Sequence, residues 1–487
     1  MKRENEAEMN ADRILPDIPI TGLTADSRQV RPGFLFAAIP GTVADGAAFI
    51  PDAVAKGAVA VLAPPGIDAG QVGSGVTLVT DANPRRRLAR MAAAFHAPQP
   101  DTVVGVTGTN GKSSVAGFTR QIWAATGLKS ASIGTLGIEG PGYTGGEGLT
   151  TPDPVDLHRE MAAMAASGID HVAMEASSHG LDQHRMDGVR FAAAAFTNLS
   201  HEHLDYHATM EAYRQAKLRL FEELVPRGGA CVVNTSAAEH DCIFNIAEER
   251  GLRVFSYGLV NGMIRVITAE ESRGGYAATL DVMGERVEID FPLPGRFQLE
   301  NALAALGLVI ATGTEARRAA QSLSRLEGVR GRMQLAGTRR NGARVFVDYA
   351  HKAEALKTVL DTLRPFVKGK LVVVFGCGGD RDTGKRPVMG RYAAQAADRV
   401  IVTDDNPRTE DAAAIRKAVL AGCPDATEIG DRAAAIGEAV RSLSDEDVLL
   451  IAGKGHETGQ KIGDRTLPFD DVEEARKAIA AADGGAA

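Results

Sequence analysis

The 487-residue sequence lacks the features of several protein classes. It has no run of about 18 apolar residues, so it contains no candidate for a membrane-spanning helix. Aromatic residues make up only 5% of the chain and the net charge is −8, which argues against the basic surface of a nucleic-acid-binding protein. The four cysteines form no C-x-x-C pair, which argues against a disulfide framework or a zinc knuckle and favours a reducing cytoplasm. They are Cys231, Cys242, Cys377 and Cys423.

Further absences concern the ends of the chain and covalent catalysis. The stretch MKRENEAEMNADRILPDIPI has acidic residues where a signal peptide has an apolar segment, so we expect a frayed tail there. A disordered tail is also expected at AADGGAA, residues 481–487. No Ser/His/Asp arrangement points to an enzyme nucleophile.

The patterns that are present predict an α/β protein. Short apolar runs alternate with Pro-Gly turns up to HAPQPD, a strand–glycine turn–helix pattern begins at Thr102, and a second such series begins after EGVRGRMQ. We predict a small N-terminal α/β domain (1–98), a central P-loop-type ATP-binding parallel sheet (99–329) and a C-terminal Rossmann-like domain (330–487). Polar residues follow the last strands, so a ligand site is expected at the carboxyl ends of that sheet.

The segment VVGVTGTNGKSS is similar to a phosphate-binding loop but lacks one glycine. The pattern G-x-x-x-x-G-K-[ST] requires glycine five positions before Gly111, and Val106 stands there. Gly108 and Gly111 nevertheless bracket a turn between a strand and a helix, Lys112 supplies a positive charge, and Ser113 offers a hydroxyl to Mg²⁺. The alternative is a strand-to-helix turn with a solvated lysine. We favour phosphate binding because strand, loop, GKS and helix occur in the required order.

The loop GTNGK[ST] resembles that of the Mur ligases and folylpolyglutamate synthases, which are ATP-dependent amide-forming enzymes. Further motifs similar to those of Mur ligases follow in order over nearly the whole chain: DSRQVRPGFLFAAIPG, MEASSHGLDQHR, TNLSHEHLDYH, YRQAKLRLF, ENALAA, VDYAHK, GGDRDTGKRP, DDNPR and GKGHE. The first of these resembles a UDP-sugar domain that the folylpolyglutamate branch lacks. The sequence is therefore identified as a member of the Mur ligase family.

The resemblance implies an ATP-dependent ligase of peptidoglycan biosynthesis, with a role in cell shape and cell division. It implies an acyl phosphate on the D-glutamyl γ-carboxylate of UDP-N-acetylmuramoyl-L-alanyl-D-glutamate, attack by the amine of meso-2,6-diaminopimelate, and Mg²⁺ as cofactor. A cytoplasmic monomer without nucleic-acid or membrane partners is expected. The alternatives are a lysine-adding ligase of the same family, a folylpolyglutamate synthase-type ligase, and a nucleotide-binding protein without turnover.

The resemblance also implies roles for individual residues. The residues expected to bind ATP are Gly108, Thr109, Asn110, Gly111, Lys112, Ser113, Asn301 and Asp348. The expected catalytic residues are Lys112, Glu175, His203 and a carbamylated Lys217, and the expected Mg²⁺ ligands are Ser113, Glu175, His203 and Lys217. The residues expected to bind the nucleotide-linked substrate are Ala25, Ser27, Thr150, Thr151, Ser177, Gln183 and Arg185. Those expected around the amino acid are Arg381, Asp405, Asn406, Pro407, Arg408, Gly453 and Glu457.

Several of these residues also have plainer interpretations. HEHLDYH could suggest zinc, but its first two histidines are one residue apart, unlike H-E-x-x-H. We expect His201 and His207 to be surface or helix-cap histidines. From the residues alone, Lys217 would be a solvated helix lysine.

The segment DDNPR could be only a turn with a solvated Arg408. Among the resembling ligases, DNPR goes with meso-diaminopimelate, and the lysine-adding members lack the arginine. A guanidinium binds the second carboxylate of diaminopimelate with paired hydrogen bonds, and lysine has no such carboxylate.

Three positions depart from the family pattern. His351 is followed by Lys352, Ala353 and Glu354, where relatives have proline and then an acidic residue. Gln334 occupies a position where many relatives have glutamate, and VVNTSAAEH lacks the usual acidic pair. These departures concern the expected ribose contacts and not the reaction class.

Overall fold

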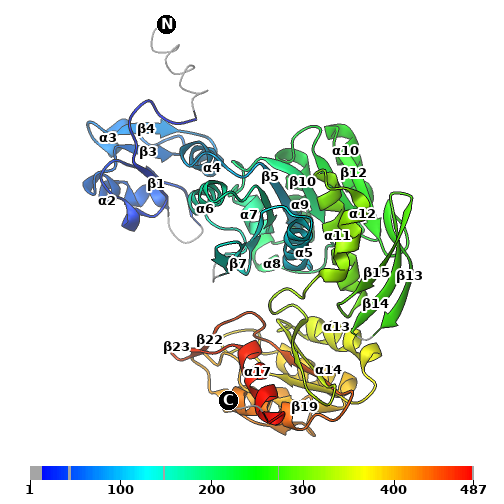
Figure 1. Cartoon of the computed structure of the whole chain (residues 1–487). Helices are drawn as coiled ribbons and strands as arrows, with labels where there is room; N and C mark the ends of the chain where they lie inside the picture. The colour runs from blue at the N-terminus through cyan, green and yellow to red at the C-terminus, as the bar shows by residue number, and fades with distance from the viewer. Residues whose placement is uncertain (1–13, 42–44, 146–148, 273, 485–487) are drawn as a thin grey trace. The chain divides into compact units, whose positions relative to one another are not determined.

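The computed structural model describes residues 14–41, 45–145, 149–272 and 274–484 (Figure 1). The chain forms two compact units: unit 1 comprises residues 1–257 and 304–315, and unit 2 comprises residues 258–303 and 316–487. Residues 1–13, most of the expected N-terminal tail, lie outside the described residues. The expected disorder at 481–487 is wrong for its first residues, since helix α17 (Asp471–Ala482) continues to Ala482, and residues 485–487 lie outside the described residues.

The N-terminal part of unit 1 is a four-stranded parallel sheet with helices. Its strands, in spatial order, are β1 (Gly22–Thr24), β2 (Phe34–Ala37), β3 (Ala60–Ala63) and β4 (Thr77–Thr80). Its helices are η1 (Ser27–Gln29), η2 (Gly46–Phe49), α2 (Ile50–Ala55), α3 (Ala69–Val72) and α4 (Pro84–Phe95). The middle strands β2 and β3 are almost entirely buried, because both faces of a small parallel sheet are covered. This confirms the predicted N-terminal α/β fold.

The rest of unit 1 is built on a larger, mainly parallel sheet. Its strands, in spatial order, are β12 (Arg253–Gly258), β11 (Ala230–Asn234), β10 (Phe191–Phe196), β5 (Thr102–Thr107), β9 (His171–Glu175), β6 (Ser130–Gly134), β7 (Gly137–Gly140) and β8 (Tyr143–Thr144). The last two are antiparallel additions at one edge. The helices are α5 (Lys112–Ala125), α6 (Pro154–Ala166), α7 (Ser178–Asp182), α8 (Leu204–His207), α9 (Met210–Arg219) with the π-turn η3 (Leu220–Leu224), and α10 (His240–Arg250). The central strands β11, β10, β5 and β9 are almost entirely buried.

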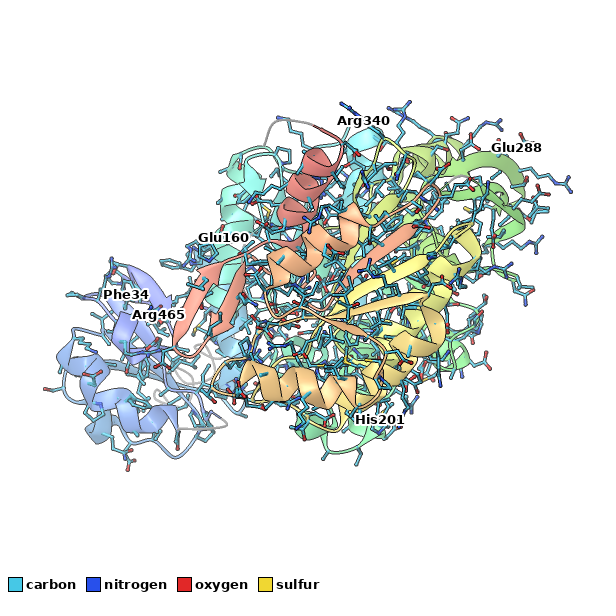
Figure 2. The ribbon with its side chains drawn as sticks, turned by 90° about the horizontal axis from the view of Figure 1, so that it is seen from below. Phe34, Glu160, His201, Glu288, Arg340 and Arg465 are labelled. Carbon is cyan, nitrogen blue, oxygen red and sulfur yellow. The ribbon has the colours of Figure 1, made fainter. Side chains whose placement is uncertain are left out.

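Unit 2 contains a set of three antiparallel strands that the sequence analysis did not predict. It consists of β13 (Ile264–Ser272), β14 (Gly275–Val282) and β15 (Glu285–Phe291). In β15 apolar and exposed residues alternate, with Val287 buried and Glu288 at the surface (Figure 2). Helix α11 (Arg296–Ala311) runs from unit 2 into unit 1, and α12 (Ala316–Ser322) and η4 (Leu323–Arg325) follow.

The C-terminal sheet of unit 2 has the predicted doubly wound pattern. Its strands, in spatial order, are β16 (Gln334–Thr338), β17 (Arg344–Asp348), β21 (Val448–Ala452), β18 (Leu371–Phe375), β19 (Arg399–Val402) and β20 (Thr427–Glu428), all parallel except β16. The helices are α13 (Ala353–Leu363), η5 (Arg364–Phe366), α14 (Lys385–Ala396), α15 (Ala412–Leu420), α16 (Arg432–Arg441) and α17, and apolar clusters cover both faces. A hairpin of β22 (Gly459–Ile462) and β23 (Arg465–Pro468) follows β21.

Two expectations from composition can be compared with the structure. All four cysteines are free thiols. Within the residues that the structure describes, no helix combines the length and apolar character needed to cross a membrane.

Candidate active site

The loop between β5 and α5 leaves no room for a side chain at Gly108. This glycine has φ +137°, and a Cβ there would lie 1.9 Å from Thr197 Oγ1. Gly111 has φ +87° and directly precedes the first turn of α5. The backbone N–H of Asn110 donates to Asn198 Oδ1 at 3.0 Å. The loop therefore ends at a helix N-terminus, where backbone N–H groups and the helix dipole attract anions.

Val106 explains why the loop is shorter than a standard P-loop. It is fully buried within β5, in register with Glu175 of β9. The strand thus occupies the position where a longer loop would begin, and a glycine is not needed there.

Two lysines meet at the carbonyl oxygen of Gly108. Lys112 Nζ donates to this oxygen at 3.0 Å and to Thr109 O at 2.8 Å, and Lys217 Nζ donates to Gly108 O at 2.7 Å. Lys217 is only 1% exposed. Burial, assisted by the charge of Lys112, lowers the pKa of Lys217 well below its ordinary value. The expectation of a solvated helix lysine from the residues alone is therefore wrong, because α9 directs Lys217 into the interior.

Glu175 lies at the end of β9, surrounded by hydrogen-bond donors. Its Oε1 accepts from Ser113 Oγ at 2.9 Å and from the Thr135 backbone N–H at 2.8 Å. A Cβ on Gly134 would lie 2.1 Å from the same oxygen, so the carboxylate requires glycine there. The hydroxyl oxygen of Ser113 and the carboxylate oxygens of Glu175 are hard oxygen ligands of the type that Mg²⁺ prefers, so the two residues fit the expected metal.

The histidines expected near the metal differ in exposure. His203 has φ +58° and a side chain that is 42% exposed, and its ring centroid lies 4.9 Å from that of His179 and 5.9 Å from that of Tyr213. His201 is exposed, as expected (Figure 2). His207 is not a surface residue, because its ring is buried against His179 and Tyr213. No group of three or more His, Cys, Asp or Glu side chains that could hold a metal occurs in the described part of the chain.

The residues expected to bind the muramoyl substrate form one hydrogen-bonded group in unit 1. Thr151 Oγ1 and Ser177 Oγ are 3.0 Å apart, and Thr151 O accepts from Arg185 at 2.7 Å. Arg185 also donates to Gln183 Oε1 at 2.7 Å, and Thr150 Oγ1 lies 3.0 Å from Thr135 Oγ1. Thr151 Oγ1 donates to Glu175 O at 3.0 Å, which connects this group to the carboxylate above.

The residues expected at the uridine end lie in the N-terminal sheet region of unit 1. Ala25 is exposed and precedes η1, and Ser27 is the first residue of η1 and is buried. The backbone carbonyl of Ser27 accepts from Lys56 Nζ at 2.9 Å.

In unit 2, loops that follow β18, β19 and β21 lie together at the carboxyl ends of these strands. The Gly379 N–H donates to Asn406 O at 2.9 Å, and Arg408 Nη1 donates to Gly379 O at 2.6 Å. Arg408 has φ +53°, and its backbone pairs with Ile462 of the β22–β23 hairpin. Arg381, on the same loop as Gly379, is exposed. The expected amino-acid residues are thus adjacent, as the strand-end argument predicted.

Glu457 and Asp405 have contrasting surroundings in this region. Burial opposes ionisation of Glu457, but the Lys454 charge and a 2.8 Å hydrogen bond from Asn406 Nδ2 outweigh it, so its pKa lies below the ordinary value. For the fully enclosed Asp405, burial prevails over Arg432 and Lys454 and raises the pKa. A Cβ on Gly453 would lie 2.9 Å from Asp405 Oδ2, so the chain passes closely over this carboxyl group.

The two residues expected to contact adenine and ribose also lie in unit 2. Asn301 Nδ2 donates to Gln298 Oε1 at 3.2 Å. Asp348 is buried, and its carboxylate oxygens accept from the backbone N–H groups of Met333 and Ala350 at 2.7 and 2.8 Å. Burial raises the pKa of Asp348. Gln334, one of the departures from the family pattern, accepts from the Gly331 N–H at 2.9 Å.

Comparison with family models assigns three regions of the chain. Residues 19–96 match the model "Mur ligase family, catalytic domain", residues 106–309 match "Mur ligase middle domain", and residues 331–455 match "Mur ligase, glutamate ligase domain". Together the three matches cover well over half of the sequence. The chain belongs to the Mur ligase family. This confirms the resemblance carried by the motifs.

Other Mur ligases are similar to this chain over nearly its full length. A UDP-N-acetylmuramoyl-L-alanyl-D-glutamate--2,6-diaminopimelate ligase of Bradyrhizobium diazoefficiens is 53% identical, with 95% of each chain covered. A ligase of the same name from Rhizobium meliloti is 51% identical over 95% of this chain and 94% of its own. A solved structure of that name has a TM-score of 0.73 at 33% identity, covering 96% of each chain. The MurF ligase of Thermotoga maritima in complex with ADP shares the fold, with a TM-score of 0.60 at 17% identity.

The structure adds residues of this Mur ligase that the sequence analysis missed. Thr135 donates its backbone N–H to Glu175. The Tyr213 hydroxyl lies 3.1 Å from Thr109 Oγ1, and the centroid of the Tyr213 ring lies 4.5 Å from Lys217 Nζ. Lys454 contacts Asn406 and Glu457. Thr135 directly follows β6, a signal that could have identified it, because residues after parallel strands face ligands.

Proposed function

We propose that this Mur ligase joins meso-2,6-diaminopimelate to the D-glutamyl γ-carboxylate of UDP-N-acetylmuramoyl-L-alanyl-D-glutamate, with ATP as the energy source, in peptidoglycan synthesis. ATP transfers its γ-phosphoryl group to the carboxylate, which gives an acyl phosphate and ADP. The amine of diaminopimelate attacks the acyl carbon, phosphate leaves, and the amine loses a proton as the amide forms. The names of relatives about 50% identical support this assignment.

In unit 1, the chain's own groups offset the charge of the phosphates. The loop N–H groups, the N-terminus of α5 and Lys112 form a fixed positive region, which stabilises charge that develops during phosphoryl transfer. We assign Ser113, Glu175, His203 and a carbamylated Lys217 to holding Mg²⁺. When bound, Mg²⁺ would neutralise phosphate charge. The low pKa of Lys217 supports carbamylation, because only a neutral amine reacts with CO₂.

The observation that carries the choice of amino acid is the loop at 404–408. Arg408 follows Asn406 on this loop, and its guanidinium is held by Gly379 O at 2.6 Å. Asn406 in turn is bonded to Glu457, a carboxylate suited to an ammonium group. A guanidinium and a carboxylate on adjoining loops match the zwitterionic end of diaminopimelate that lysine lacks.

A competition assay tests this choice. The wild type should ligate meso-diaminopimelate and reject L-lysine by roughly 10⁴-fold in kcat/KM, because lysine has no second carboxylate for Arg408 to bind. Arg408→Ala should lose most diaminopimelate ligation while the affinity for ATP is kept. Equal use of the two amino acids, or an unaffected Arg408→Ala variant, would refute the assignment.

We further propose the remaining site and domain assignments. The domains are residues 1–98, 99–329 and 330–487, and the three family matches fall inside these bounds. The nucleotide-linked substrate is bound by the hydrogen-bonded group around Thr151 and Arg185, with its uridine end near Ser27. A monomer in the cytoplasm, where ATP and the nucleotide-linked precursor are available, completes the proposal.

A further inference from the structure

Lys454 is a lysine without solvent exposure, although it lies in a loop. It stands between Gly453, with φ +116°, and Gly455, with φ +57°. A Cβ on Gly455 would lie 2.7 Å from Tyr349 Cβ, and one on Gly453 would lie 2.9 Å from Asp405 Oδ2. The two glycines allow the loop to pack against the ends of neighbouring strands, and the lysine between them points inward.

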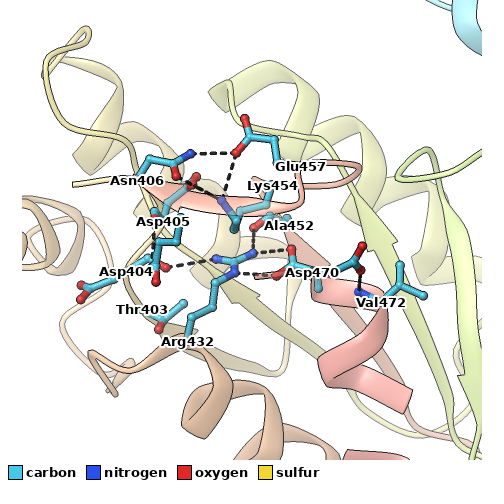
Figure 3. Close-up of polar contacts among 12 residues, drawn as sticks. Thr403, Asp404, Asp405, Asn406, Arg432, Ala452, Lys454, Glu457, Asp470 and Val472 are labelled. Carbon is cyan, nitrogen blue, oxygen red and sulfur yellow. Dashed lines mark hydrogen bonds and ion pairs between the residues drawn. The ribbon is translucent and has the colours of Figure 1, made fainter. Parts of the chain in front are cut away.

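Three acceptors surround Lys454 Nζ. They are Asn406 Oδ1 at 3.1 Å, Glu457 Oε2 at 3.0 Å and Gly459 O at 2.5 Å. Figure 3 shows the contacts with Asn406 and Glu457. A lysine ammonium has three N–H donors. All of them are used within the chain, so Lys454 acts through the groups that it holds and not through a ligand.

The Glu457 carboxylate is held through one of its two oxygens. Oε2 accepts from Lys454 and from Asn406 Nδ2, whereas no hydrogen bond to Oε1 occurs among the described residues. The Glu457 side chain is 31% exposed. One oxygen is therefore anchored, and the other is available to a positively charged group.

A buried ion pair lies beside the loops that carry Lys454 and Asn406. Arg432 donates to both oxygens of Asp471 at 2.7 Å, and neither side chain is exposed. The same guanidinium donates to Ala452 O at 3.0 Å and to Asp404 O at 3.3 Å, as Figure 3 shows. It thus joins the end of β21 to the start of the 404–408 loop, which fixes the distance between Lys454 and Asn406.

We propose that Lys454 is a positioning residue for the amino-acid substrate: it locks Asn406 and Glu457 together so that Glu457 Oε1 faces the substrate ammonium group. The inference rests on the proposed function for the identity of that substrate. It assigns to Lys454 a role in substrate affinity, with no contact to the substrate itself.

A double-mutant cycle on the full-length enzyme tests the role of Lys454. We would measure KM for meso-diaminopimelate, ATP and the nucleotide-linked dipeptide in Lys454→Met, in Glu457→Gln and in the combined variant. Lys454→Met should raise KM for diaminopimelate about 10–100-fold, the cost of a lost charge-assisted hydrogen bond, with the other two KM values unchanged. The double variant should be no worse than Glu457→Gln alone, because both changes remove one function.

Lys461→Met is the matched control. Lys461 lies in the nearby β22 and is exposed, and its substitution removes the same charge. Its KM values should equal those of the wild type. Thermal melting shows whether Lys454→Met is folded. If it is not, Lys454→Gln replaces it in the test, because the glutamine amide keeps a donor. The KM of Lys454→Gln for diaminopimelate should rise less than that of Lys454→Met.

Three results would overturn the inference. The first is an unchanged KM of Lys454→Met for diaminopimelate, and the second is a rise of all three of its KM values together. The third is a KM of the double variant that rises by the product of the two single-variant increases. Failure of the proposed function is distinguishable from these results. In that case the wild-type enzyme itself would not ligate diaminopimelate.

Discussion

Lys217 in unit 1 and Lys454 in unit 2 are both buried lysines near the carboxyl end of a parallel sheet, but their partners differ. Among the described residues, Lys217 Nζ has one hydrogen bond, to Gly108 O, and it lies above the Tyr213 ring. Lys454 Nζ has three acceptors, one of them a carboxylate. The first site contains a second cation, Lys112, as well as the anion Glu202, whereas Lys454 Nζ lies 3.0 Å from the Glu457 carboxylate and 4.0 Å from that of Asp405.

The two lysines differ in how far their surroundings compensate for the loss of water. Desolvation disfavours an ammonium group unless acceptors and opposite charges compensate for the lost water. For Lys217, burial and the charge of Lys112 outweigh the opposite charge of Glu202, so its pKa lies well below the ordinary value. Lys454 has three hydrogen-bond acceptors, through which it joins Asn406, Glu457 and Gly459. Burial alone therefore does not predict the chemistry of a lysine, whereas burial together with its acceptors does.

Chemical rescue tests this comparison with the largest expected effect. Lys217→Ala should lower kcat by about 10²–10³-fold, the usual loss when one group that stabilises transition-state charge is removed. Short-chain carboxylic acids should restore part of the activity, because they supply the carboxylate that a carbamate would have provided. The same acids should not rescue Lys454→Ala, in which a cation is missing. Full activity of Lys217→Ala, or rescue of Lys454→Ala, would break the comparison.

The pH dependence of stability compares the two units through a histidine in each. Burial lowers the pKa of His158 in unit 1 and of His456 in unit 2 to about 4. Between pH 6.5 and pH 4 these histidines bind a proton in the unfolded chain but stay neutral in the folded chain. The free energy of unfolding should therefore fall as the pH drops from 6.5 to 4. The loss is about 3 kcal/mol for each histidine.

Urea denaturation between pH 7 and pH 4 measures this loss. His158→Leu should make the pH dependence shallower, because it removes the titrating group of unit 1 and leaves that of unit 2. An identical slope in the variant would show that His158 does not contribute to the acid sensitivity.

The smallest expected effect is on thermal stability. Lys454→Met removes one donor from each of three acceptors and should cost about 2 kcal/mol. Lys217→Met replaces an amine that has one acceptor by an apolar chain of similar length, and should change stability by less than about 1 kcal/mol in either direction. Differential scanning calorimetry of the two variants compares these values directly. Equal destabilisation would show that the number of acceptors does not distinguish the two lysines.

The strands were predictable where they are buried on both faces. Such strands are continuous apolar runs, as in β5 and β18, and periodicity alone identifies them. The sheet of β13, β14 and β15 was missed because much of it is polar and exposed, although the alternation in β15 was a usable signal. The β22–β23 hairpin has almost no buried residues, so its position depends on contacts with Arg408 and Asn406.

The sequence by itself determined the buried apolar strands, the glycine loop, the family and the motif DDNPR, because each depends on neighbouring residues or on a short spacing. Only the tertiary structure decided which polar side chains are buried and what surrounds them. Gly108 is 109 residues from Lys217, and Asn406 is 48 residues from Lys454. The loss of water around a side chain, and the acceptors that replace it, come from segments that meet only when the sheets form.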